Sequence, residues 1–187
     1  MAFDKAKAAK AVALLLEALG EDPKRSGLAK TPERVAELYA ELFSGLHSNP
    51  EKLLETTHEL KHDEMVLLKG IPLYGLCEHH LLPFFGKASI AYIPKNDRVA
   101  GFGTLAKVVD ALAKKPTLQE KLTTELAELL MKKLKPRGVL VVIEGRHLCL
   151  EMTGANKSGT KTITSAVRGI FRDKAATRTE ALSLIKG

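Results

Sequence analysis

The sequence contains no tryptophan, and only three tyrosines and two cysteines occur among its 187 residues. Two cysteines do not make a disulfide framework, so we expect thiols that are buried, reactive or bound to a metal in a reducing compartment. Nucleic-acid-binding surfaces often interleave basic and aromatic residues, and this chain lacks that pattern. We therefore expect no nucleic acid as a partner.

Long hydrophobic runs are absent as well. No apolar stretch approaches the roughly 18 to 20 residues that a membrane-spanning helix requires. The apolar positions of segment 1–22 recur at helical spacing and no small-residue cleavage site follows, which favours an amphipathic helix over a signal peptide. We expect a cytoplasmic protein with no membrane partner.

The chain is basic, with a net charge of +7 and an isoelectric point near 9.4. Such a charge suits an anionic partner, for example a phosphorylated metabolite. The basic residues are scattered, however, and their densest stretch, 131–138, ends a predicted helix, where cations interact favourably with the helix dipole. The charge therefore gives little support to an extended anion-binding surface.

The hydrophobic periodicity predicts an α+β fold with elements in the order ααα, ββααββ and α. Two β-hairpins that bracket two helices indicate an antiparallel sheet with helices on one face. We divide the chain into an N-terminal helical region, 1–60, and a domain that contains the sheet, 61–187. The predicted helices cover 5–19, a segment with Thr31 as N-cap and Pro32 at the first helical position, a segment after Asn49-Pro50, 103–115, 117–135 and 177–186; the predicted strands cover 64–75, 87–94, 139–154 and 160–171.

A four-stranded sheet of this kind leaves two edges open and its second face exposed. Proteins manage open edges by pairing or covering them. We therefore expect the chain to form a homo-oligomer in which several subunits close into a barrel.

The segment "GLCEHHLLPFFG" places a thiol, a carboxylate and two imidazoles next to one another. Cys77 and His80 stand three apart, a spacing that is common for two ligands of one zinc ion in a turn. The other cysteine, Cys149, follows His147 on the predicted strand 139–154, and the two-residue alternation of a strand places both on one face. Cys77, His80 and Cys149 would form a Cys2His site with a fourth position left for water, which is the pattern of catalytic zinc.

Zinc bound in this way would lower the pKa of its water toward about 7. His79 and His147 would remain beside it as proton carriers. The residues alone leave an alternative open, because Cys-x-x-His pairs arise by chance and buried cysteine often behaves as a small hydrophobe. The pairing of a histidine with each of the two cysteines favours the metal site.

Longer segments resemble the GTP cyclohydrolase I family. They are "LCEHHLLPFFGKASIAYIP" and "HLCLEMTG", followed by "TSAVRG", and the likeness extends to "ALGEDPKRSGLAKTPERV", "ELFSGL" and "TRTEALSLI". The resemblance covers most of the chain and implies the tunnelling fold. In that fold the subunits close into antiparallel barrels and stack as a decamer, with active sites at the subunit boundaries.

The resemblance also implies that Cys77, His80 and Cys149 bind Zn2+ and that His79 and His147 act as acid–base residues. The reaction of the family begins when zinc-bound water adds to C8 of the guanine of GTP. The imidazole ring opens, formate leaves, the ribose undergoes an Amadori rearrangement, and a new ring closes to give dihydroneopterin triphosphate. This reaction opens the route to pterins and folate.

Glu120, with Gln119 beside it, matches the guanine-reading position of the family, where a carboxylate makes a bidentate contact with the ring N–H and the exocyclic amine. The residues alone leave an alternative, because Glu120 is also spaced to form a capping box with Thr117. Arg34, in "TPERV", matches a phosphate contact from a neighbouring subunit.

The chain departs from the family at positions that bind the ribose and the triphosphate. Where the family reads Gly-Leu-Ser-Lys-Leu-x-Arg, this chain has Gly103, Thr104 and Lys107 at the serine, lysine and arginine positions. Thr153 stands where the family has a further arginine. A lysine cannot reproduce the bidentate fork of arginine, so the predicted phosphate site is weakened.

These departures leave three functions open. The first is a GTP cyclohydrolase in which other cations, such as Lys157 or Lys161, replace the missing ones. The second is a paralogue with the same zinc chemistry on a less phosphorylated guanine derivative or another purine. The third is an inactive homologue in which zinc only stabilises an oligomer. His79 and His147 argue against it, because a structural zinc site needs no histidines beyond its ligands.

Overall fold

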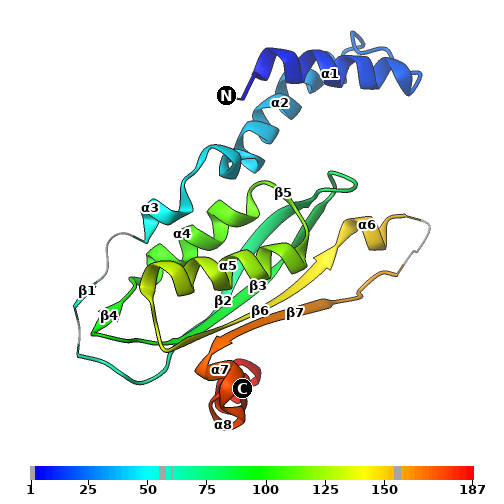
Figure 1. Ribbon diagram of the computed structural model, residues 1–187. Helices are drawn as coiled ribbons and strands as arrows, with labels where there is room; N and C mark the ends of the chain where they lie inside the picture. The colour runs from blue at the N-terminus through cyan, green and yellow to red at the C-terminus, as the bar shows by residue number, and fades with distance from the viewer. Residues whose placement is uncertain (1–2, 55–57, 60, 154–156) are drawn as a thin grey trace.

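The computed structural model describes residues 3–54, 58–59, 61–153 and 157–187, which contain a curled five-stranded sheet with two long helices on one face (Figure 1). The N-terminal helices extend away from one end of the sheet, and the C-terminal helix lies at the opposite end. The predicted α+β class is confirmed. Closure of the sheet into a barrel by several subunits stays a prediction.

The strands form one large and one small sheet. Their bounds are His58–Glu59 for β1, Val66–Cys77 for β2, Pro83–Ile93 for β3, Arg98–Val99 for β4, Pro116–Thr117 for β5, Gly138–His147 for β6 and Thr162–Gly169 for β7. The large sheet has the order β5-β2-β3-β6-β7, and its four long strands pair antiparallel. β5 runs parallel to the end of β2, and β1 pairs with β4 in the small sheet.

Two predictions about these strands were wrong. Region 1–60 is not helical throughout, since β1 lies within it, and the large sheet has five strands rather than four because of β5. The missed strands, β1, β4 and β5, are each two residues long, too short to show the alternation by which a strand is predicted. The predicted boundary between 1–60 and 61–187 falls at residue 60, outside the described residues, and stays a prediction.

The main core lies between the sheet and two helices, α4 (Phe102–Ala113) and α5 (Gln119–Leu134). Apolar residues recur every three or four positions along both helices, so each turns one stripe toward the sheet. Leu126 of α5 is fully buried in one cluster with Ile90 of β3 and Val141 of β6. This packing fixes the N-terminus of α5 above the ends of β2 and β6.

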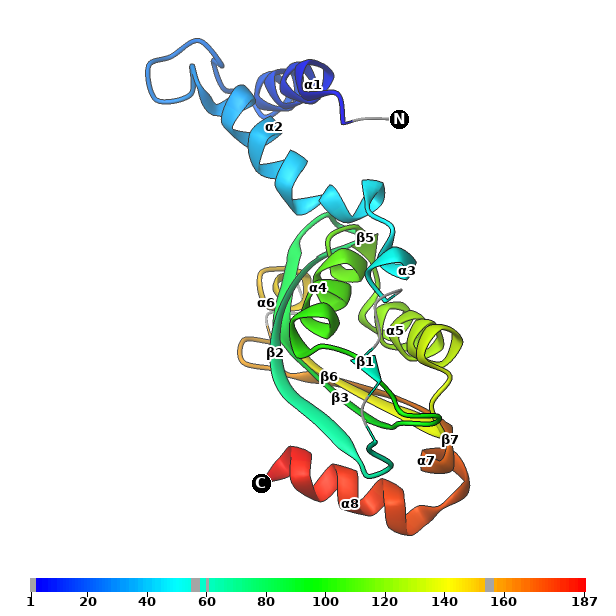
Figure 2. The same ribbon diagram turned by 90° about the vertical axis from the view of Figure 1, so that its left-hand side faces the viewer.

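The other face of the sheet is partly covered. Two C-terminal helices, α7 (Ile170–Asp173) and α8 (Ala175–Lys186), pack Phe171 and Ala181 into a second apolar cluster on that face (Figure 2). Toward the opposite end the same face is open, and Ile163 is 65% exposed there. The expectation of a wholly exposed second face is therefore corrected, because the C-terminal helices cover part of it.

The N-terminal segment forms a helical arm. Its helices are α1 (Lys5–Ala18), α2 (Thr31–Leu42), the 3-10 turn η1 (Ser44–His47) and the short α3 (Pro50–Leu53). Thr31 is the first residue of α2 rather than its N-cap, a position that Lys30 occupies without a side-chain bond. Every helix in the described part of the chain is too short or too polar to cross a bilayer.

Candidate metal and active site

The chain turns sharply at the end of β2, and this turn carries Cys77 and His80. The N–H of Cys77 donates to the carbonyl of Leu82 (2.9 Å), and the N–H of Leu81 donates to the carbonyl of Cys77 (2.8 Å). Leu81 has a φ of 54°, in the left-handed region where a bulky residue persists only if its surroundings hold it. The turn brings Cys77 Sγ to 3.7 Å from His80 Nδ1.

The third candidate ligand comes from a segment whose predicted structure was wrong. β6 ends at His147, and Cys149 lies in a single helical turn, α6 (Leu148–Glu151), rather than on a strand over 139–154. The ladder between β3 and β6 stops there because the next residue of β3, Pro83, has no N–H to donate. His147 and Cys149 therefore do not share a strand face, and a helical turn presents Cys149 instead.

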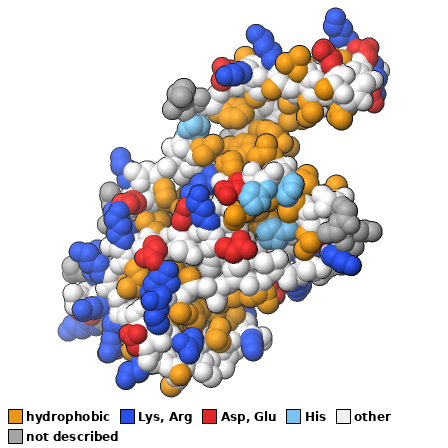
Figure 3. Space-filling view, turned by 45° about the vertical axis from the view of Figure 1, so that its right-hand side comes forward, with side chains coloured by type: hydrophobic (Ala, Val, Ile, Leu, Met, Phe, Trp, Pro, Cys, Tyr) orange, Lys and Arg blue, Asp and Glu red, His pale blue; other side chains and the backbone are white. Residues whose placement is uncertain are grey.

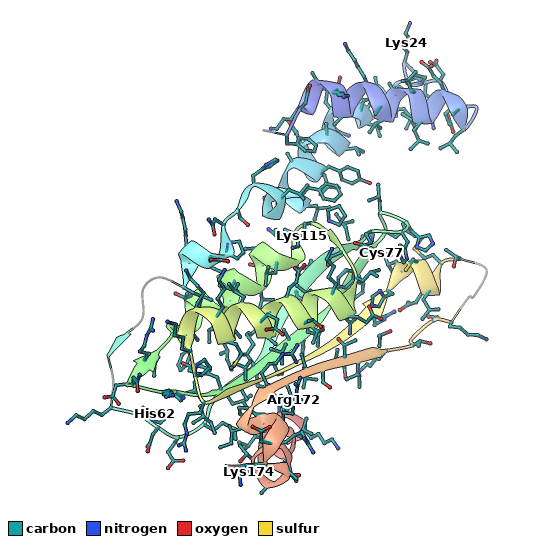
Figure 4. The ribbon with its side chains drawn as sticks, viewed as in Figure 1. Lys24, His62, Cys77, Lys115, Arg172 and Lys174 are labelled. Carbon is teal, nitrogen blue, oxygen red and sulfur yellow. The ribbon has the colours of Figure 1, made fainter. Side chains whose placement is uncertain are left out.

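The donor atoms of Cys77, His80 and Cys149 lie within 4.8 Å of one another, at the end of the sheet beside α6 (Figure 4). Two thiols and an imidazole are a donor set that suits zinc, and three protein ligands leave a position for a catalytic ligand. Burial and the neighbouring Cys77 thiol raise the pKa of Cys149. A bound cation would reverse that shift, because a coordinating thiol loses its proton. The residues fit zinc, and their role as zinc ligands stays a prediction.

His147 is held by two neighbours. Its ring stacks on the buried ring of Phe84, with centroids 4.9 Å apart and an interplanar angle of 10°. Its Nε2 lies 2.8 Å from Oε1 of Gln119. Burial lowers the pKa of His147, and the Glu120 carboxylate acts in the opposite direction. The contacts fix the imidazole in place, and the lowered pKa favours its neutral form.

One pocket of about 450 Å³ joins most of the predicted site, and histidine side chains gather on this side of the molecule with acidic and hydrophobic ones (Figure 3). Among the residues that line it are Cys77, His80 and Cys149, His79 and His147, and Gln119 and Glu120. The predicted capping box is wrong: Thr117 lies in β5, and the N-cap of α5 is Leu118, which makes no side-chain bond. Pairing with β2 keeps Thr117 out of the cap, so Glu120 has no capping partner there.

The predicted phosphate-binding residues lie elsewhere. Arg34 is exposed on α2, Gly103 and Lys107 are exposed on α4, and none of the three lines the pocket. Lys161 makes an ion pair with Glu144 at 3.0 Å. No lysine or arginine belongs to the described residues around the pocket. A single copy of the chain therefore does not bring these cations to the candidate ligands.

Two residues that hold the α6 turn were not predicted from the sequence. Arg146 donates from Nε and Nη2 to the two carboxylate oxygens of Glu151, at 2.8 and 2.6 Å. The Glu151 side chain is only 8% exposed. Residues five apart on a strand point to opposite faces, so the predicted strand gave no sign of this pair. The helical turn makes the contact possible and anchors the segment that carries Cys149.

The chain is similar to known proteins over nearly its whole length. Residues 8–186 match the family model described as GTP cyclohydrolase I. The chain is 56% identical over 185 residues to the GTP cyclohydrolase 1 of Pelotomaculum thermopropionicum, covering 99% of this chain and 98% of that protein. It is 57% identical over 182 residues to that of Carboxydothermus hydrogenoformans (97% and 95% covered) and 52% identical over 186 residues to that of Brevibacillus brevis (100% of both). With the family model matched over nearly the whole chain and relatives this similar at full length, the chain belongs to the GTP cyclohydrolase I family.

Proposed function

We propose that the protein is a zinc-dependent GTP cyclohydrolase, which hydrolyses the imidazole ring of the guanine of GTP and yields formate and dihydroneopterin triphosphate. The observation that carries the proposal is the convergence of Cys77, His80 and Cys149 in one pocket. The same pocket holds two further histidines and the Glu120 carboxylate. The relatives named GTP cyclohydrolase 1 support this assignment.

Cys77, His80 and Cys149 would hold the zinc. When bound, zinc supplies a Lewis acid and makes a hydroxide-like nucleophile available near neutral pH. The exposed side of His80 and the open pocket leave room for a substrate to reach that position.

His79 and His147 would move the protons. Ring opening and formate release require a proton to leave the attacking water and another to reach the nitrogen that is set free, a task for groups that titrate near neutral pH. The lowered pKa of His147 favours a neutral imidazole that can accept a proton. His79 is exposed and lines the same pocket.

Glu120 would recognise the base. Guanine presents a ring N–H and an exocyclic amine side by side, and one carboxylate can accept from both in a charge-assisted pair. Glu120 is the second residue of α5, lines the pocket and is free of the capping role expected for it. Gln119 beside it is almost fully buried.

Other subunits of a homo-oligomer would complete the part of the site that binds the phosphates. The family resemblance implies that this oligomer is a decamer. Arg34 on α2 and Lys107 on α4 are exposed, as is Gly103 near the start of α4, and a neighbouring copy could carry them to the pocket. Leu14 and Leu19 in the N-terminal arm are 65% and 71% exposed, which favours a partner surface over solvent. Light scattering on the purified protein tests this, and a monomeric mass would contradict it.

A second candidate function is the same chemistry on a guanine derivative with fewer phosphates. It is favoured by the absence of lysine and arginine among the described residues that line the pocket. The loss of cationic side chains where the triphosphate is expected, at Thr104 and Thr153, points the same way.

Formate release by the zinc-loaded protein from GTP, GMP, guanosine and guanine, measured in parallel, tests both functions. Fast turnover of GTP alone would support the first. Turnover only of a substrate with fewer phosphates would support the second. If none of the four compounds releases formate while zinc is bound in stoichiometric amount, both functions are contradicted. The protein would then be an inactive homologue or an enzyme that acts on another purine.

A further inference from the structure

A buried amide links the first residue of α5 to two strands of the sheet. The side chain of Gln119, a residue only 1% exposed, donates from Nε2 to the carbonyls of Ile143 and Thr162, each at 3.0 Å. The same nitrogen lies 3.1 Å from Oγ1 of Thr164. The amide nitrogen is therefore surrounded by acceptors and has no hydrogen left for a ligand.

The two main-chain carbonyls determine which way the amide points. A carbonyl oxygen can only accept a hydrogen bond, so Ile143 and Thr162 must face the NH2 group and not the oxygen of Gln119. The oxygen then faces His147 Nε2, at 2.8 Å. Since an amide oxygen only accepts, Nε2 must carry the hydrogen. The basic nitrogen of the neutral imidazole is then Nδ1.

We propose that Gln119 is a positioning residue that holds His147 in the Nε2–H form, so that His147 exchanges protons with the substrate through Nδ1. Gln119 acts through the histidine and makes no contact with the purine. This inference rests on the proposed function, since it assigns a role within the same pocket. It also replaces the expectation that Gln119 binds substrate directly.

The backbone beside Gln119 and His147 leaves room for the Gln119 amide because residue 145 is a glycine. A Cβ atom at Gly145 would overlap Oε1 of Gln119 and would lie 3.7 Å from Nε2 of His147. The ring of Phe84 stacks against the plane of the His147 imidazole. This contact restrains rotation of the imidazole, in addition to the hydrogen bond from its Nε2. The orientation of His147 thus depends on contacts from β3, β6 and α5 together.

Three variants separate positioning from structure. Gln119→Met removes the amide at similar length, and Gly145→Ala displaces Oε1 while keeping the amide. Thr123→Val is the matched control, because Thr123 Oγ1 bonds the main-chain carbonyl of Gln119 (2.7 Å) and Thr164 (2.6 Å) but does not touch His147.

With the best substrate, Gln119→Met and Gly145→Ala are expected to lower kcat about 10- to 100-fold, with KM changed less than about threefold and zinc content unchanged. Thr123→Val is expected to keep kcat within about twofold of the original protein. A rise in KM at constant kcat would overturn the inference and make Gln119 a substrate contact. An unchanged kcat in both variants would overturn it too.

Solid-state NMR on the zinc-loaded full chain, labelled with 15N-histidine, gives a readout that needs no turnover. Spectra taken about two pH units above the ordinary histidine pKa of about 6.5 report the neutral tautomer, and subtraction of a His147→Asn spectrum isolates one residue. The Nε2–H form is expected in the original chain and a mixture in Gln119→Met. The Nδ1–H form in the original chain would overturn the inference, whether or not the protein releases formate, so a failure of the proposed function is recognised separately.

Discussion

The two ends of the large sheet bury different kinds of residue. Four polar residues are buried in the described part of the chain, and three of them, Thr117, Gln119 and Thr123, lie at the end that holds the pocket. At the opposite end, Phe171 and Ala181 pack into a cluster of apolar side chains. One end is held by directed hydrogen bonds and the other by packing.

The difference matters because the two kinds of contact fail differently. A buried polar group without a partner costs about 1–3 kcal/mol, so a network of such groups specifies one arrangement. Apolar contacts are less directional and scale with the surface buried. We therefore expect substitutions of the residues that line the pocket to alter chemistry more than stability, and substitutions at the far end to do the reverse.

Cys149→Ser should give the largest effect at the pocket end. Loss of one of three ligands removes the Lewis acid, which is worth several kcal/mol, so formate release should fall at least about 1,000-fold. Metal content by mass spectrometry should fall close to zero. Compared with zinc-free original protein, the variant should keep its free energy of unfolding within about 1 kcal/mol. A variant that retains both zinc and turnover would exclude Cys149 as a ligand.

Phe171→Ala should give the largest effect at the far end. Phe171 is fully buried, and truncation of a buried phenylalanine lowers the free energy of unfolding by about 3–5 kcal/mol. Denaturant unfolding measures this, and kcat per folded molecule should not change. Leu184→Ala on α8, where the leucine is 51% exposed, is the control and should cost less than about 0.5 kcal/mol. A large loss of kcat in Phe171→Ala would contradict the expectation that the far end affects stability and not chemistry.

Glu120→Gln sharpens the comparison within α5. Replacing the carboxylate removes charge-assisted acceptance from guanine, and kcat/KM should fall about 10- to 100-fold with no change in zinc content. Glu128→Gln, on the same helix, breaks only an exposed ion pair with Arg168 and should leave kcat/KM unchanged. Equal effects of the two substitutions on kcat/KM would show that Glu120 does not recognise the guanine.

Glu151→Gln should give the smallest effect of the four. Weakening the bidentate pair with Arg146 loosens the α6 turn, and zinc affinity, measured by competition with a chelator, should fall about tenfold. Glu144→Gln is the control, because its ion pair with Lys161 is exposed on both sides. The idea that the α6 turn is anchored for metal binding fails if both variants bind zinc equally.

Much of the site was predictable because its parts are local. Cys77 and His80 belong to one turn, so their spacing alone brings them together. The long strands and the two covering helices follow from periods of two and about 3.6 residues, which persist over eight residues or more. Short elements were not predicted for the same reason: β1, β4, β5 and α6 are too brief for any period to appear.

The sequence by itself determined the class of fold, the family and the pair Cys77–His80, since each depends on patterns within one segment. Only the tertiary structure decided that Cys149 arrives on a helical turn anchored by Arg146 and Glu151. It also decided that Gln119 meets His147, 28 residues away along the chain. These contacts depend on the register of β3 against β6 and on where the packing of the core sets the first turn of α5, and neither is encoded in local periodicity.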